Sequence, residues 1–352
     1  MDGLKPRLLP VDPAKPQPDV IATAAQVLRD GGLIVLPTDT VYGVAAAPGG
    51  EEKIYAAKSR DRAKPIPLLV AEAAEVSRRG GKMGWRARLL ARRYWPGPLT
   101  LVLPAAGGGK EGFRIPNHEV TLAVIRAAGG ALRVTSANQS GEAAARDAQS
   151  ALAALAGHVE LALDAGPSPL GRESTVVEED GETLRVLRSG AISQAAILAR
   201  PTLLFVCTGN ICRSPMAEYL LKRWLGPDPK WDVKSAGVSA EDGAPASEAA
   251  VAALAEKGID LSRHASRQLD GALVDAAYLI VVMTNAHKDT VLRRFPEARS
   301  RVFLLKSFGA EGRDEDIEDP FGMSFHEYQR VRDEMDKVMP DLLLYLHEWT
   351  TR

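Results

Sequence analysis

The sequence predicts an α/β protein of two domains, residues 1–198 and 199–352. The length supports two domains, because 352 residues exceed the usual size of a single one. Short apolar runs typical of buried strands alternate with stretches of helical period in both halves, which is the pattern of α/β folds. The second half keeps this alternation to its end, so we expect a parallel sheet there with helices on both faces.

The composition, with 45% apolar and 25% charged residues, is that of a soluble globular protein. No apolar run approaches the roughly 20 residues that a membrane span needs. The first residues, with Asp2, Lys5 and several prolines, lack the apolar core of a signal peptide. We therefore expect a cytoplasmic protein with no membrane partner. Two cysteines, Cys207 and Cys212, lie in one short loop, which excludes a disulfide framework and a zinc cluster built on cysteines.

Charge is divided unevenly along the chain, although its net value is −1. Residues 1–200 hold 25 Lys and Arg against 21 Asp and Glu, whereas residues 201–352 hold 19 against 24. Basic side chains crowd between Lys53 and Arg93, where they could face a nucleotide or RNA. They could equally form one solvated helix face, and on charge alone we favour that interpretation.

The first half opens on residues 1–18, which are rich in proline and predict an extended lead-in. Apolar residues at helical spacing predict a helix over 19–29, followed by a buried strand over 33–36. The further elements expected in this half are helices at 51–57, 85–94 and 147–156, and strands at 66–70, 99–103, 114–115, 132–135, 174–177 and 184–187, the last two as a hairpin. Residues 105–112, rich in glycine and alanine, predict a surface loop. They are not a phosphate-binding Walker loop, because Glu111 follows Lys110.

The second half is expected to form four strands and four helices. The strands are at 202–206, 232–237, 278–283 and 301–305, and the helices at 215–224, 246–257, 287–295 and 324–346. Pro340 could break the last helix. Residues 319–322 predict a loop just before it.

Polar and cationic residues follow the strands of the first half in a fixed order. The motifs are Pro37-Thr-Asp-Thr-Val-Tyr-Gly43, Lys58-x-Arg60 with Lys64-Pro65, Ser136-x-Asn138, Ser174-Thr-Val176 and Arg188-x-Gly190. Lys58 and Arg60 alone would be surface charges more often than ligands. The ordered set, over about residues 15–195, resembles the YrdC-like threonylcarbamoyl-AMP synthase family. One departure is that Leu69 and Val70 stand where some family members carry a histidine.

This resemblance implies a twisted open α/β sheet and the condensation of L-threonine, bicarbonate and ATP to threonylcarbamoyl-AMP and pyrophosphate. The product serves to modify a tRNA adenosine, so tRNA or tRNA-modification proteins are implied partners. The candidate ATP- and threonine-binding residues are Thr38, Thr40, Lys58, Arg60, Lys64, Arg114, Ser136, Asn138, Ser174 and Arg188. Their cations can neutralise triphosphate and carboxylate charge, and no nucleophile stands out, so catalysis would be positioning and charge neutralisation. Mg²⁺ is expected with ATP, although no carboxylate pair marks a metal site. The alternative is that this half only binds nucleotide or RNA.

The stretch Cys207-Thr-Gly-Asn-Ile-Cys-Arg-Ser214 lies between a predicted strand and a predicted helix. Backbone N–H groups converge in such a loop, and the helix dipole adds partial positive charge, so the site suits an anion. The forked guanidinium of Arg213 can hold two phosphate oxygens. At the other end of the loop the same field would favour the thiolate of Cys207. A lone cysteine is more often a small buried hydrophobe, but the arginine and the strand–helix context reverse that expectation.

This loop resembles the active-site loop of low-molecular-weight protein tyrosine phosphatases, and the likeness covers about residues 202–348. It implies that Cys207 is the nucleophile, that Arg213 binds phosphate and that Asp319 is the general acid, with no cofactor needed. An Asp-Pro in a loop would otherwise be ordinary turn chemistry. The resemblance also implies a supporting set: Thr208, Gly209, Asn210, Ile211, Cys212 and Ser214 in the loop, with Ser235 and His264 bracing it.

The expected substrate is a phosphorylated protein, with phosphotyrosine favoured. Protein arginine phosphatases of this fold carry Thr where this chain has the bulkier, apolar Ile211. Phosphoarginine therefore stays an alternative. Arsenate reductase is a weaker one, because that mechanism relays oxidation through further cysteines and no cysteine follows Cys212.

Overall fold

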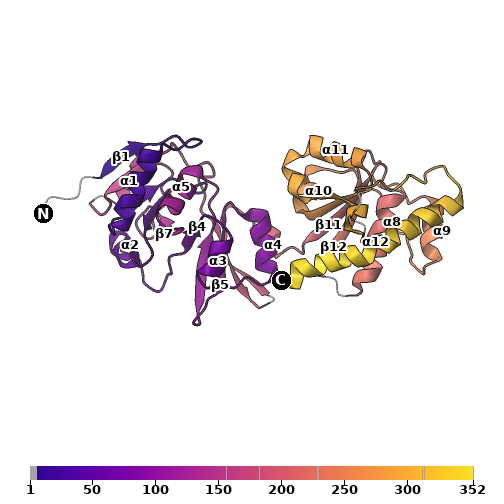
Figure 1. Ribbon diagram of the computed structural model, residues 1–352, viewed down its shortest axis with the longest axis horizontal. Coiled ribbons are helices and arrows are strands. Elements are labelled where there is room, and N and C mark those ends of the chain that lie inside the picture. The colour runs from indigo at the N-terminus through magenta and orange to yellow at the C-terminus, as the bar shows by residue number, and fades with distance from the viewer. Residues whose placement is uncertain are drawn as a thin grey trace. The chain divides into compact units, whose positions relative to one another are not determined.

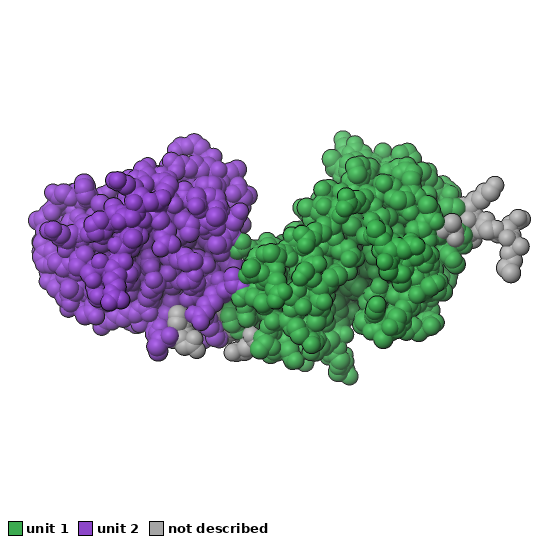
Figure 2. Space-filling model, turned by 180° about the vertical axis from the view of Figure 1, so that it is seen from behind, with its two compact units in different colours: residues 1–198 green, residues 199–352 purple. Residues whose placement is uncertain are grey.

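The computed structural model describes residues 6–351 except 156, 182, 228, 229, 311 and 313. The chain divides into two compact units, Met1–Leu198 and Ala199–Arg352, which are coloured separately in Figure 2. None of the described helices is long and apolar enough to cross a membrane.

The first unit contains one large mixed sheet. Its elements are β1 (Arg7–Pro10), α1 (Pro18–Arg29), β2 (Ile34–Leu36), β3 (Gly43–Ala46), α2 (Glu51–Lys58), β4 (Leu68–Val70), α3 (Ala74–Arg78), α4 (Trp85–Tyr94), β5 (Leu99–Pro104), β6 (Lys110–Arg114), α5 (Glu119–Ala127), β7 (Ala131–Ser136), α6 (Ala148–Ala154), β8 (Leu161–Asp164), β9 (Thr175–Asp180), β10 (Thr183–Arg188) and α7 (Gln194–Leu198). Within the described residues ten strands pair in the order β1-β8-β2-β3-β7-β4-β6-β5-β9-β10.

Helices cover both faces of this sheet (Figure 1). They are needed there because successive side chains of the central strands point to opposite faces and are apolar on both. In β2, Ile34 and Leu36 pack in one core with α1 and α5. Val35, between them, packs in the other core with α2 and α6. The sheet is open at both ends, where β1 and β10 are edge strands.

Several first-unit expectations differ from the structure. Residues 7–10 of the expected lead-in form an edge strand that pairs in parallel with β8, and their mostly exposed side chains leave no apolar pattern to predict it. Part of the expected loop 105–112 belongs to β6, which pairs with β5. The elements β3, α3, α5, β8 and α7 were not predicted. The end of the expected helix 147–156, Ala156, lies outside the described residues.

The second unit contains a four-stranded sheet in the order β12-β11-β13-β14, all parallel. Its elements are β11 (Thr202–Cys207), α8 (Arg213–Leu225), β12 (Asp232–Gly237), α9 (Glu248–Ala255), α10 (Gly271–Ala276), β13 (Ala277–Val282), α11 (Asn285–Arg294), η1 (Pro296–Arg301), β14 (Val302–Leu304), η2 (Leu305–Phe308) and α12 (Phe325–Thr351). Leu204 and Val206 of β11 pack in one core with α10 and α11. The opposite face is covered by α8 and α12 (Figure 1). The expected α/β class is thus confirmed in both units.

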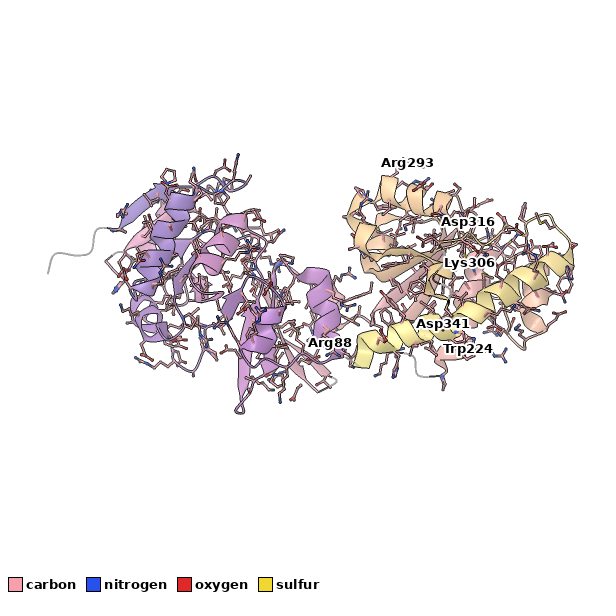
Figure 3. The ribbon with its side chains drawn as sticks, in the orientation of Figure 1. Arg88, Trp224, Arg293, Lys306, Asp316 and Asp341 are labelled. Carbon is pink, nitrogen blue, oxygen red and sulfur yellow. The ribbon has the colours of Figure 1, made fainter. Side chains whose placement is uncertain are left out.

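The terminal helix α12 runs through Pro340 without a break, so the expected interruption there was wrong. Polar contacts hold α12 in place on either side of that residue, and Figure 3 labels two of the side chains that make them, Lys306 and Asp341. Lys306 pairs with Glu334 at 2.5 Å, and Asp341 accepts a hydrogen bond from the amide of Ala310 at 3.1 Å. Tertiary packing therefore outweighs the hydrogen bond that proline removes from a helix interior.

Candidate functional site

The loop from Cys207 to Ser214 joins the carboxyl end of β11 to the first turn of α8. Cys207 is the last residue of the central strand and is 3% exposed. Arg213 is the first residue of α8 and is 4% exposed. An anion in this loop would lie at the positive end of the α8 dipole.

Asn210 is the brace of this loop. Its backbone has φ of 54°, a left-handed conformation that is unfavourable for non-glycine residues, although less so for asparagine. Four hydrogen bonds offset that cost. Its amide nitrogen donates to Ser214 and Ser235, both at 2.8 Å, and its amide oxygen accepts from the backbone N–H of Arg267 at 2.9 Å. His264 Nε2 lies 2.7 Å from the Asn210 carbonyl oxygen, so this nitrogen must carry the proton.

The thiol of Cys207 has one hydroxyl partner. Its Sγ lies 3.0 Å from Ser214 Oγ. Asn210 already donates to that oxygen, so the hydroxyl proton of Ser214 is free to point at the sulfur or at the Ala236 carbonyl, 3.3 Å away. A hydroxyl in this position can donate to a thiolate and stabilise it.

The guanidinium of Arg213 reaches across to the segment before α12. One terminal nitrogen donates to the Ile317 carbonyl at 3.0 Å, and the other forms an ion pair with Asp319. Asp319 is 47% exposed, so the pair joins a buried cation to a solvent-facing acid. Within the described part of the chain, the buried Nε of Arg213 has no hydrogen-bond partner. That nitrogen is therefore a buried donor that no protein acceptor satisfies.

The remaining loop residues contact neighbouring helices or form the loop surface. Cys212 is buried, with its sulfur 3.3 Å from both Ser247 Oγ and Tyr328 OH, and burial raises the pKa of this thiol. Ile211 is half-buried, and a Cβ placed on Gly209 would lie 3.7 Å from its Cγ1 atom. Ser247 caps the start of α9 and Tyr328 lies in α12, so no pattern local to the loop could have found them.

Gly237 packs against the backbone of the loop, and no sequence pattern singled it out. A Cβ at this position would lie 2.3 Å from the carbonyl oxygen of Thr208 and 2.9 Å from the backbone nitrogen of Asn210. No side chain fits there without moving the loop. The end of β12 is thus packed against the phosphate loop backbone.

His287 is a second residue that the sequence did not single out. It is buried beside the loop, with Nε2 2.9 Å from Thr208 Oγ1 and Nδ1 2.8 Å from Thr284 Oγ1. Burial, with the nearby charge of Arg213, lowers the pKa of His287 to about 4. The imidazole is therefore neutral at neutral pH and links the loop to the start of α11.

This burial predicts an acid sensitivity of the second unit. The folded pKa of His287, about 4, lies below the ordinary value of 6.5, so the unfolded chain binds the proton first as pH falls. The free energy of unfolding should therefore drop by about 3 kcal/mol between pH 7 and pH 4. Amide exchange of β11 at both pH values measures it. In His287→Asn the free energy of unfolding should fall much less between these pH values. In His326→Asn, a substitution at an 81% exposed site, it should fall as far as in the wild type. Equal drops in all three proteins would contradict the assignment.

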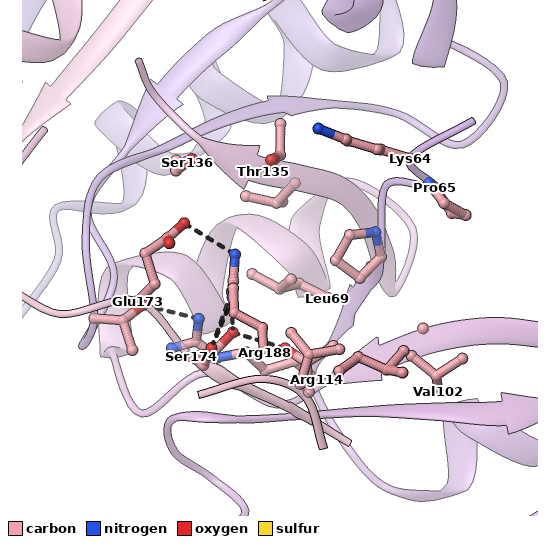
Figure 4. A pocket seen from close by; sticks show the side chains of 18 of the residues that line it. Lys64, Pro65, Leu69, Val102, Arg114, Thr135, Ser136, Glu173, Ser174 and Arg188 are labelled. Atoms are coloured by element: carbon pink, nitrogen blue, oxygen red, sulfur yellow. Dashed lines mark hydrogen bonds and ion pairs between the residues drawn. The ribbon is translucent and has the colours of Figure 1, made fainter. Parts of the chain in front are cut away.

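The first unit has a pocket of about 790 Å³ over strands β3–β7, β9 and β10. It brings together eight of the ten predicted ligand residues: Thr38, Thr40, Arg60, Lys64, Arg114, Ser136, Ser174 and Arg188 (Figure 4). Five basic side chains line it against two acidic ones, which gives an excess of positive charge. Three lining residues with charge, Lys110, Glu173 and Glu178, were not predicted, because none of them belongs to the motifs that pointed to this site.

Two arginines on this wall are fixed by hydrogen bonds. Arg114 is 6% exposed and donates to Thr40 Oγ1 at 2.8 Å, to Asp39 Oδ1 at 2.5 Å and to the Gly97 carbonyl at 3.0 Å. Arg188 pairs with Glu173 at 2.9 Å and donates to the carbonyl and hydroxyl oxygens of Ser174. Both guanidinium groups are therefore pre-positioned to meet an anion.

Lys58 and Asn138 do not line the pocket. Lys58 is 1% exposed, and its Nζ donates to the Ser136 carbonyl at 2.5 Å, to the Asn138 carbonyl, and to Asn138 Oδ1 at 3.2 Å. Burial lowers the pKa of this lysine to about 8. In this structure Lys58 thus lies beside the pocket, where it holds the Ser136–Asn138 turn.

Comparison with known proteins follows the same division of the chain. Residues 26–190 match the Sua5, YciO and YrdC family, described as telomere recombination, and residues 202–351 match the low molecular weight phosphotyrosine protein phosphatase family. A protein-arginine-phosphatase of Geobacillus stearothermophilus is 46% identical over 40% of this chain and 92% of its own length.

Two further relatives represent the two halves. A Ralstonia solanacearum protein assigned as low molecular weight protein-tyrosine-phosphatase EpsP is 46% identical over 34% of this chain and 78% of its own length. A Mycobacterium tuberculosis protein assigned as a threonylcarbamoyl-AMP synthase is 37% identical over 50% of this chain and 87% of its own length. The two units therefore define a fusion of two α/β enzymes. The chain belongs to both families, the YrdC-like family in its first unit and the low-molecular-weight phosphatase family in its second.

Proposed function

We propose that the first unit makes threonylcarbamoyl-AMP from L-threonine, bicarbonate and ATP in the cytoplasm, for modification of a tRNA adenosine. The observation that carries this proposal is the pocket with five basic side chains, in which residues of all five sequence motifs meet. Two of the three substrates and all the phosphates are anions, so bringing them together requires fixed positive charge. Arg60, Lys64, Arg114 and Arg188 supply it, and Ser136 and Ser174 supply hydrogen bonds.

Mg²⁺ would accompany ATP in this reaction. Among the described residues no cluster of three His, Cys, Asp or Glu side chains could hold a metal, and both acids of the pocket are in ion pairs. The ion would therefore take its ligands mainly from phosphate oxygens and water, as Mg²⁺ commonly does with nucleotides. The residues of this chain would bind the phosphates around it.

The synthase proposal is tested by pyrophosphate release. We expect release from ATP only when L-threonine and bicarbonate are both present. The alternative, that this half only binds nucleotide or RNA, predicts nucleotide binding without release. Absence of release under all conditions would refute the synthase proposal.

We further propose that the second unit hydrolyses phosphomonoesters through a phospho-cysteine intermediate. The observation that carries this is the contact of Cys207 with Ser214 inside the loop, together with the ion pair that joins Arg213 of the loop to Asp319. The thiolate of Cys207 would attack phosphorus while Arg213 holds two phosphate oxygens. Asp319 would protonate the departing oxygen and then, as a carboxylate, take a proton from the water that cleaves the intermediate. Arg213 would exchange its contact with Asp319 for the phosphate dianion.

Phosphotyrosine in proteins is the substrate class that we propose for this site. Sequence identity does not decide it, because the arginine phosphatase and the tyrosine phosphatase relatives are each 46% identical. The side chains at the loop favour an aromatic ring. Ile211 presents an apolar surface on the loop, and Phe321, two residues after Asp319, is 65% exposed. Neither side chain can hydrogen-bond to the guanidinium of phosphoarginine.

Replacement of Ile211 separates the two substrate classes. Ile211→Thr should lower kcat/KM for a phosphotyrosine peptide by about tenfold, because the ring loses apolar contact worth about 1–2 kcal/mol. Activity toward a phosphoarginine peptide should not fall. Ile211→Val is the matched control, since valine has the shape of threonine but stays apolar. A wild-type preference for phosphoarginine would refute the phosphotyrosine assignment.

A further inference from the structure

The pocket of the first unit has to hold one positive group as well as several negative ones. Under the proposed function, on which this inference rests, ATP, bicarbonate and the threonine carboxylate are anions. The α-ammonium group of L-threonine is the cation among them. Five basic side chains line the pocket against two acidic ones, so the net charge of its wall would repel that ammonium. An acidic side chain is needed to bind it.

Glu173 is the acid best placed for this task. Glu178, the other lining acid, has both carboxylate oxygens in ion pairs, one with Lys110 at 3.0 Å and one with Arg185 at 2.5 Å. Asp39 does not line the pocket; its Oδ1 pairs with Arg114, and its Oδ2 has no hydrogen-bond partner within the described residues but is buried. Of the two acids that line the pocket, Glu173 alone has an oxygen outside an ion pair, and within the described residues that oxygen, Oε2, has no hydrogen-bond partner.

Glu173 and Arg188 together form a receptor for a zwitterion. Their ion pair is 2.9 Å long, and the two side chains are 38% and 43% exposed, so both can be reached from the pocket. Figure 4 shows the carboxylate of Glu173 turned toward the guanidinium of Arg188, with Ser174 beside them. An α-amino acid carries its ammonium and carboxylate on one carbon atom. A carboxylate and a guanidinium that lie side by side can therefore bind both groups at once, the carboxylate the ammonium and the guanidinium the carboxylate.

We propose that Glu173 binds the α-ammonium group of the amino-acid substrate, while Arg188 beside it faces the carboxylate. The pocket thereby selects an amino acid over a hydroxy acid of the same shape. Ser174, whose oxygens already accept from Arg188, keeps the guanidinium aligned for this.

The test compares two ligands on two proteins. L-threonine and 3-hydroxybutyrate differ by the amine alone. Their dissociation constants are measured by calorimetry on the full chain, with an ATP analogue that cannot be cleaved between its α and β phosphates. The wild type should prefer threonine by roughly tenfold to a hundredfold, the usual range for a charged hydrogen bond. Glu173→Gln should lose most of that preference through weaker threonine binding, with hydroxybutyrate binding no weaker.

Two results would overturn the proposal. If Glu173→Gln weakens both ligands by the same factor, Glu173 only orients Arg188 and does not touch the amine. If wild-type protein binds the ATP analogue but prefers neither ligand, the ammonium is bound by other groups. A wild type that releases no pyrophosphate with threonine and bicarbonate overturns the proposed function itself, which is a separate readout.

Control variants complete the design. Glu52→Gln breaks an exposed ion pair with Arg62, outside the pocket, and should leave the threonine preference unchanged. Glu173→Asp keeps the charge but shortens the side chain, so its preference should fall between those of the wild type and Glu173→Gln. Unchanged affinity for the ATP analogue shows that each variant is folded.

Discussion

Replacing Cys207 by serine is expected to abolish hydrolysis of aryl phosphates. A serine hydroxyl is not ionised near neutral pH, so it cannot act as the nucleophile in the place of a thiolate. The rest of the phosphate site should survive, because Asn210, Arg213 and Asp319 keep their contacts. We expect a fall in kcat of at least about a thousandfold, with phosphate still bound.

The measurement is turnover of an aryl phosphate, with binding of inorganic phosphate as the check on folding. Cys212→Ser is the matched control. It replaces the second thiol, whose partners Ser247 and Tyr328 can hydrogen-bond equally to a hydroxyl. That variant should retain activity within about tenfold of the wild type. Substantial activity in Cys207→Ser would show that another group attacks phosphorus.

The sequence predicted those elements whose apolar period is long or strong. Helix α4 occupies residues 85–94 as expected, and strand β11 was predicted to within one residue. Strand β1 was missed because an edge strand is held by backbone hydrogen bonds to β8, and its side chains need not alternate. Strand β3 was missed because its four small or apolar residues are all buried, which gives no period of two.

The residues of the candidate sites differ in the same way in how far the sequence could predict them. Residues of the loop 207–214 are close in sequence, so their spacing alone predicts that Cys207 and Arg213 can contact the same anion. The contacts of Gly237, His287 and Tyr328 with that loop depend on how β12, α11 and α12 pack, which no local pattern encodes. In the first unit, a motif can identify a lysine but cannot say which way its side chain points.

Lys58 is such a lysine, and its replacement is the second substitution for which we expect a large effect. Lys58→Met should destabilise the first unit by about 3 kcal/mol and remove synthase activity. Its ammonium donates to three acceptors of the Ser136–Asn138 turn, and each acceptor left without a donor costs about 1–3 kcal/mol. Burial of the charge already opposes folding, as the pKa lowered to about 8 indicates. Replacing the charged lysine by methionine also removes this cost of burying a charge. The net loss of stability is therefore smaller than the three unsatisfied acceptors alone would give.

Amide exchange in β7 measures the stability of the first unit, and pyrophosphate release measures its activity. Lys53→Met is the control, because Lys53 lies on the same helix and makes one hydrogen bond, to the Gly31 carbonyl, at an exposed site. It should change the stability by less than about 1 kcal/mol. A Lys58→Met protein with unchanged stability and a higher KM for ATP would mean that Lys58 contacts phosphate directly. The two roles separate in this way because a residue that touches only substrate leaves the stability of the free protein unchanged.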